Sequence, residues 1–176
     1  MKKGLAIVGA LLLALLLQTR LAAFLVLGTS PLDLVLIVVV YVGITSGPTT
    51  GLLAGAAAGL AQDALSSGII GIGGLAKTLV GYFVGQASMQ FNIAGVLPRF
   101  VTFVLATAVH ATVFMGAYEL LNLRDFGFPW AGVLGQGAAN ALVGVVVLQV
   151  IELLPGSVER RQARGGGAMR VSRRLD

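Results

Sequence analysis

Four glycines spaced four residues apart dominate one segment of the chain. They are Gly47, Gly51, Gly55 and Gly59, in the run GPTTGLLAGAAAGLAQD. An interior glycine weakens a helix in water by about 0.5–1 kcal/mol relative to alanine, but in lipid small residues let two helix backbones approach closely. The stripe therefore predicts tight helix packing within a membrane, either inside the molecule or against a partner helix. Gly81 and Gly85, also four residues apart, are candidates for the same kind of contact.

The composition is that of a membrane protein. Hydrophobic residues make up 57% of the chain and charged residues 11%, and 25 of the 176 residues are glycine. Average glycine usage is about 7%, so glycine is roughly doubled here. The chain has no cysteine, which excludes disulfides and cysteine-based metal sites.

Six apolar segments predict an all-α integral membrane protein, a bundle of six transmembrane helices. We expect helices at residues 5–27, 34–45, 48–65, 75–89, 98–121 and 130–154. Asp33 is placed to cap the second helix, and Pro48 suits the first turn of the third. The predicted organisation is one transmembrane domain over residues 1–155 and a disordered basic cytoplasmic tail over residues 156–176.

The distribution of lysine and arginine predicts that both termini are cytoplasmic. Six crossings put the two ends on the same side, and cytoplasmic segments carry the excess of basic residues. Lys2, Lys3 and Arg99 then lie inside with the tail arginines Arg160, Arg161, Arg164, Arg170, Arg173 and Arg174. These arginines either orient the chain and attract anionic lipid, or contact an acidic cytoplasmic partner.

Asp63 is a carboxylate at the predicted outer end of the third helix. An ionisable residue in a membrane segment is a candidate functional site, so Asp63 either orders the turn that follows it or contacts a partner or ligand. Lys77, near the outer end of the fourth helix, is the nearest predicted counter-ion. We expect Asp63 and Lys77 to form an outer-end polar pair.

His110 and Asn140 fall near the middle of the fifth and sixth helices. If those helices are antiparallel neighbours, the two side chains lie at a similar depth, and a hydrogen bond between imidazole and amide is expected. A proton relay is the alternative, and it needs more titratable groups in line.

The chain lacks the residue patterns of catalysis. One histidine and scattered acids do not supply three or four converging metal ligands. The run Gly71-Ile72-Gly73-Gly74 lacks the lysine and hydroxyl residue of a phosphate-binding loop. We therefore expect neither enzymatic activity nor a cofactor.

The order of several short motifs resembles the MreD family of the bacterial rod-shape (elongation) system. The motifs are Ala14-Leu15-Leu16-Leu17-Gln18, Pro31 before an apolar run ending at Tyr41, Gly55-x-x-x-Gly59-x-x-x-Asp63 followed by Gly71, and Thr78-Leu79-Val80-Gly81-Tyr82. The resemblance covers residues 5–155. One departure is that Asp33 stands two residues after Pro31, where a polar residue is expected directly after the proline.

The resemblance implies a non-enzymatic protein of the bacterial cytoplasmic membrane. Its implied direct partner is MreC, in an assembly with RodA, a class B penicillin-binding protein and MreB filaments that carries out peptidoglycan synthesis; a homodimer is left open. The implied fold is similar to the substrate-binding subunit of energy-coupling-factor transporters. A substrate-binding subunit of a vitamin or small-molecule transporter is therefore the alternative, although the sequence offers few polar side chains for a ligand cavity.

Overall fold

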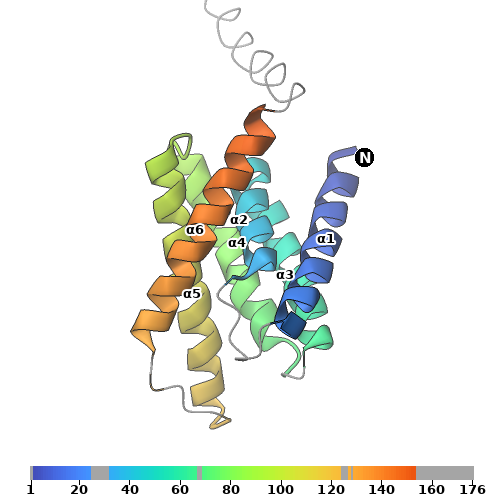
Figure 1. Ribbon diagram of the computed structural model, residues 1–176, viewed down its shortest axis with the longest axis vertical. Helices are drawn as coiled ribbons and strands as arrows, with labels where there is room; N and C mark the ends of the chain where they lie inside the picture. Colours follow the sequence, from blue (N-terminus) through green and yellow to red (C-terminus); the bar gives the residue numbers. More distant parts are fainter. Residues whose placement is uncertain (1, 25–31, 67–68, 124–126, 128, 154–176) are drawn as a thin grey trace, which may run out of the picture. The chain divides into compact units, whose positions relative to one another are not determined.

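The computed structural model is all-helical and describes residues 2–24, 32–66, 69–123, 127 and 129–153. Its six helices are α1 (Lys2–Phe24), α2 (Leu34–Ser46), α3 (Pro48–Leu65), α4 (Ile72–Gln90), α5 (Val96–Leu120) and α6 (Trp130–Leu153) (Figure 1). The prediction of six helices is confirmed. α4 begins earlier than predicted because Gly73 and Gly74 are helical and face α3.

The chain divides into two compact units, Met1–Gly144 and Val145–Asp176. The first holds α1 to α5 and the first part of α6. The described part of the second is the rest of α6, up to Leu153. The predicted basic tail, with its six arginines, lies outside the described residues.

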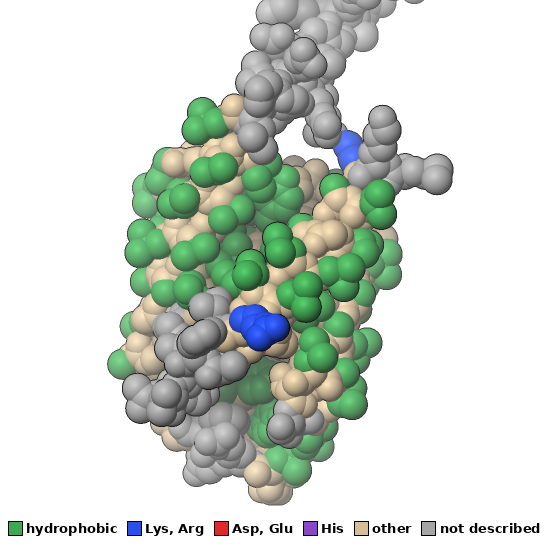
Figure 2. All heavy atoms as spheres, turned by 45° about the vertical axis from the view of Figure 1, so that its right-hand side comes forward, with side chains coloured by type: hydrophobic (Ala, Val, Ile, Leu, Met, Phe, Trp, Pro, Cys, Tyr) green, Lys and Arg blue, Asp and Glu red, His purple; other side chains and the backbone are tan. Residues whose placement is uncertain are grey.

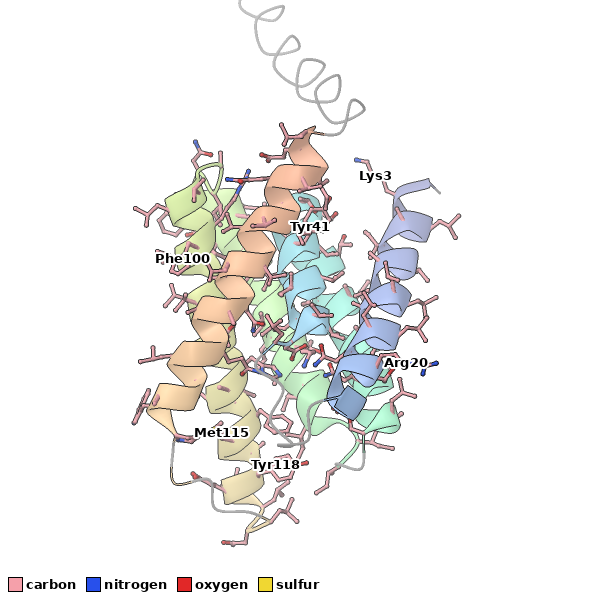
Figure 3. The ribbon with its side chains drawn as sticks, in the orientation of Figure 1. Lys3, Arg20, Tyr41, Phe100, Met115 and Tyr118 are labelled. Carbon is pink, nitrogen blue, oxygen red and sulfur yellow. The ribbon has the colours of Figure 1, made fainter. Side chains whose placement is uncertain are left out.

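Among the described residues, three helices are long and apolar enough to cross a membrane. Their spans are Lys3–Arg20, Val96–Leu120 and Trp130–Leu153. Lys3 and Arg20 lie near the two ends of α1 (Figure 3), about 26 Å apart at the helical rise of 1.5 Å per residue. That separation is close to the hydrocarbon thickness of about 30 Å. α2, with 13 residues, is shorter than such a span, so the count of six crossings stays a prediction.

Two glycine positions let the chain turn sharply between helices. Gly47, with φ of 87°, separates α2 from α3, and Pro48 then opens α3. Gly71, with φ of 110°, precedes α4. Side chains with a Cβ rarely adopt such angles, so glycine at these two positions allows α2, α3 and α4 to fold back on one another.

The glycine stripe of α3 packs against α4, the most extensive helix pair in the fold. A Cβ added at Gly59 would lie 2.6 Å from the Cα of Gly74, and one at Gly51 or Gly55 would overlap the α4 backbone. Gly81 faces Gly51 in turn. These contacts place backbone against backbone, which only glycine permits.

Two predicted packing glycines differ from this pattern. Gly85 of α4 is enclosed by the backbone of Pro48, at the start of α3. Gly47 has no atom within 4 Å of an added Cβ. The role of Gly47 in the fold is therefore the turn before α3.

α1 packs on this group through one apolar face. Leu11, Ala14 and Leu15 are buried against a cluster that includes Val35 and Val39 of α2. The opposite face of α1 leaves several large side chains exposed, among them Leu5, Leu12, Leu13 and Leu16. Hydrophobic side chains far outnumber charged ones on the face that Figure 2 shows, as expected for helices that face lipid.

Candidate functional site

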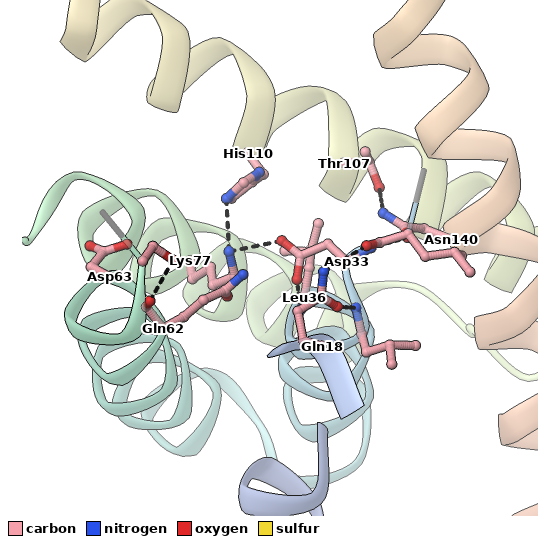
Figure 4. Close-up of polar contacts among 12 residues, drawn as sticks. Gln18, Asp33, Leu36, Gln62, Asp63, Lys77, Thr107, His110 and Asn140 are labelled. Atoms are coloured by element: carbon pink, nitrogen blue, oxygen red, sulfur yellow. Dashed lines mark hydrogen bonds and ion pairs between the residues drawn. The ribbon is translucent and has the colours of Figure 1, made fainter. Parts of the chain in front are cut away.

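A charged group is buried where α2, α4 and α5 meet. Lys77 Nζ of α4 lies 2.8 Å from Asp33 Oδ2, and the two side chains are 4% and 8% exposed. The same nitrogen lies 3.0 Å from His110 Nε2 of α5 (Figure 4). Because an ammonium group only donates, Nε2 is the acceptor in this contact, and the ring carries its proton on Nδ1.

Asp33 also caps α2, as the sequence predicted. Its Oδ1 accepts a hydrogen bond of 2.9 Å from the backbone N–H of Leu36. The first N–H groups of a helix have no partner within the helix, and a carboxylate there is favoured by the helix dipole. The Asp33 side chain therefore accepts a hydrogen bond from the first turn of α2 and also neutralises the charge of Lys77.

Two amide side chains from other helices bind the backbone groups just before and at the start of α2. Gln18 of α1 accepts from the Leu34 N–H through Oε1 and donates through Nε2 to the Leu32 carbonyl, both at 2.9 Å. Asn140 of α6 accepts from the Asp33 N–H at 2.9 Å. Non-helical backbone inside a membrane protein is tolerated when protein groups satisfy it, and these two amides do so here.

Asn140 also joins α6 to α5. Its Nδ2 donates to Thr107 Oγ1 at 3.1 Å, and the Thr107 hydroxyl donates to the Phe103 carbonyl at 2.9 Å. Asn140 and Thr107 are both almost fully buried. We call Gln18, Asp33, Lys77, Thr107, His110 and Asn140 the polar cluster (Figure 4).

The predicted pair of Asp63 and Lys77 is wrong. Within the described residues Lys77 pairs with Asp33, while Asp63 Oδ2 accepts from the backbone N–H groups of Gly71 at 2.8 Å and Gly74 at 3.0 Å. Asp63 is thus satisfied by the start of α4, where the helix dipole favours a carboxylate. Its position fits the structural alternative, in which Asp63 orders the connection that follows α3.

The predicted hydrogen bond between His110 and Asn140 is wrong as well. Both residues belong to the polar cluster, but His110 faces Lys77 of α4 and Asn140 faces Asp33 and Thr107. Thr107 of α5, about one turn before His110, is the residue that bonds to Asn140, while His110 bonds to Lys77 of α4.

Sequence reasoning missed the roles of Gln18 and Thr107 and the charge partner of Lys77. Gln18 carries a weak signal, because it is the first of three consecutive polar residues, with Thr19 and Arg20, that interrupt the apolar run of α1. Thr107 has no such signal, since threonine is common in apolar helices and bonds to its own helix.

The ion pair and hydrogen bonds of the polar cluster link side chains from different helices, so that each of its buried polar side chains has a partner. The ammonium group of Lys77 contacts both the carboxylate of Asp33 and the imidazole of His110. In the part of the chain that the structure describes, no three or more His, Cys, Asp or Glu side chains are grouped to hold a metal ion. The chemistry that the contacts support is charge neutralisation and capping of a buried helix start.

Replacing Gln18 by leucine is expected to destabilise the protein by about 1–3 kcal/mol, because it leaves the Leu34 N–H and Leu32 carbonyl without these partners. Gln86→Leu is the matched control, since within the described part of the chain the Gln86 amide bonds to the exposed Tyr82 hydroxyl and to no backbone group. Thermal unfolding of both variants in detergent micelles measures the difference. Equal melting temperatures would contradict the capping role.

Comparison with known proteins gives one match. Residues 3–150 match the family described as rod shape-determining protein MreD. No curated protein and no solved structure matches the chain significantly. The similarity to energy-coupling-factor subunits therefore stays a prediction. The family match spans α1 to α5 and nearly all of α6, including every residue of the polar cluster, and the chain belongs to the MreD family of rod shape-determining proteins.

Proposed function

We propose that this chain is a non-enzymatic membrane scaffold of the bacterial cell-elongation machinery. The observation that carries the proposal is the family match over residues 3–150. The polar cluster supports it, because its buried polar groups bind one another and the start of α2. Such contacts serve a structural role.

In this proposal the chain spans the bacterial cytoplasmic membrane six times with both termini in the cytoplasm. It binds MreC directly, and through that contact it helps couple peptidoglycan synthesis by RodA and a class B penicillin-binding protein to MreB filaments. The three long apolar helices and the cations at both ends of the α1 span support a membrane location.

Helix docking is the proposed mechanism. The α4 backbone packs directly on Gly51, Gly55 and Gly59. A partner helix is therefore expected to contact apolar side chains on the outside of the bundle. Exposed side chains of this kind occur on five helices and include Leu13, Leu60, Phe83, Leu105 and Leu142.

The test is to introduce a photo-crosslinking residue singly at those five exposed positions in cells. We expect a crosslink to a single-span MreC protein from one or two neighbouring positions and from none of the others. Val39 is the control site, because its side chain is fully buried and should crosslink to no other protein.

Two results would contradict the scaffold proposal. Recovery of a pair of ATPases with a coupling subunit, or of a bound vitamin, would support the transporter subunit instead. If MreC crosslinks to none of the five positions and does not co-purify, direct binding is wrong.

A further inference from the structure

Arg20 is a charged side chain on an exposed, apolar face of α1. Leu13, Leu16 and Leu17 before it are exposed, and Arg20 is exposed as well. Figure 3 shows the Arg20 side chain pointing away from the bundle. Among the described residues no carboxylate forms an ion pair with Arg20. Because a charge within a membrane segment requires water or an anion beside it, that group is expected to come from outside the bundle.

The polar cluster shows at which level of the bundle Arg20 lies. Gln18, two residues before Arg20, binds the start of α2, where Asp33 is the cap. Asp33 pairs with Lys77, and Lys77 contacts His110 of α5. These contacts place Gln18 of α1 and His110 of α5 at a similar level. Arg20 lies about 3 Å beyond that level, at the helical rise of 1.5 Å per residue.

α5 continues past the same level with an uncharged surface. Its exposed positions between Val109 and Gly116 carry no charge, and the Thr112 hydroxyl donates to a carbonyl of its own helix. The first charged residue of α5 after His110 is the exposed Glu119, about 14 Å further along the helix. This part of α5 therefore suits hydrocarbon up to Glu119.

The apolar surfaces of α1 and α5 thus end at levels that differ by about 10 Å. Figure 3 agrees, since Tyr118 of α5 lies further from Lys3 along the bundle than Arg20 does. A bilayer of uniform thickness would leave either the Arg20 guanidinium in hydrocarbon or the apolar end of α5 in water. Membranes accommodate such a mismatch by local thinning, while long basic side chains extend toward the headgroups.

We propose that the bilayer is thinner beside α1 than beside α5, and that phosphate groups of lipid headgroups bind Arg20 at this thinned edge. A guanidinium group binds phosphate through two parallel hydrogen bonds. A carboxylate on a partner helix is the other anion that suits Arg20. Lipid is favoured, because the step between α1 and α5 requires the bilayer to adapt whether or not a partner is bound. Binding of MreC plays no part in this proposal.

The test measures the depth of spin labels on the full chain in nanodiscs of phosphatidylethanolamine and phosphatidylglycerol. Because the chain has no cysteine, a single introduced cysteine carries the only label. Leu17 and Val109 are matched sites, since both are exposed and each stands one residue before Gln18 or His110. Relaxation by oxygen and by a water-soluble nickel complex reports how deep each label lies.

We expect a shallow label at Leu17 and a deep one at Val109. Leu17 is three residues from Arg20, or about 5 Å, whereas Val109 is ten residues from Glu119, or about 15 Å. Two sites at one level of the bundle would have equal depths in a bilayer of uniform thickness.

Substitutions at Arg20 test whether its charge draws the phosphates. Arg20→Leu should move the Leu17 label deeper, toward the depth of the Val109 label, because no cation then attracts the headgroups. Arg20→Lys keeps a cation and should leave the Leu17 label shallow. Thr19→Val is the matched control and should not change the depth, since the exposed Thr19 hydroxyl bonds within its own helix.

Other outcomes overturn the proposal. Two shallow labels would mean that the bilayer is flat at the level of Arg20 and that the end of α5 stands in water. Two deep labels, or a shallow Leu17 label that does not respond to Arg20→Leu, would mean that lipid phosphate does not bind Arg20. If Arg20→Leu also abolished a crosslink from Leu13 to another protein in cells, the anion would belong to a partner helix. The comparison of Leu17 with Val109 keeps Arg20 in place, so it decides the matter even if an Arg20 variant does not fold.

Discussion

Asp33→Ala is expected to destabilise the protein by about 3–5 kcal/mol, because it leaves the buried ammonium group of Lys77 without its counter-ion. Loss of the helix cap adds about 1 kcal/mol. The Lys77 side chain is 4% exposed, so water cannot replace the carboxylate. Unfolding in detergent micelles measures the stability, and the amount of protein in membranes should fall as well.

A double substitution separates the charge from the cap. Asp33→Asn with Lys77→Met removes both charges and keeps a side-chain oxygen to accept from the Leu36 N–H. Replacing a buried ion pair by groups of similar volume is often close to neutral, so this variant should recover most of the lost stability. If it is as unstable as Asp33→Ala, the unpaired charge is not the cause.

Gly55→Leu is expected to prevent α3 from packing on α4. A Cβ at this position already overlaps the backbone of Lys77 and Thr78, and a leucine adds three more carbons. Overpacking a well-filled interior by smaller amounts costs about 1–3 kcal/mol, so a larger loss and little folded protein are expected. Membrane yield and thermal unfolding are the measurements.

Gly135→Leu is the matched control for this substitution. Gly135 is an exposed helical glycine of α6 with no atom within 4 Å of an added Cβ. Leucine should be accepted there with normal yield. A folded Gly55→Leu protein that fails to bind its partner would show instead that the stripe is a docking surface.

The positions of the helices followed from local features of the sequence. Apolar runs, Pro48 and the glycines at helix junctions act over a few residues, so α2, α3 and α6 begin at the predicted residues. The capping role of Asp33 was predictable for the same reason, since a cap bonds to a residue three positions away. The glycine stripe likewise indicated close packing, although not the helix that fills it.

The sequence by itself determined that this chain forms apolar helices able to approach one another closely, because spacing and composition are properties of each segment. Only the tertiary structure decided which polar groups meet. The sequence predicted Asp63 as the partner of Lys77, but its partner is Asp33, 44 positions away along the chain. Asp63 is instead held by the amides that open α4. These pairings depend on how the helices are rotated and on which helix start lies beside which side chain, and packing of the whole molecule sets both.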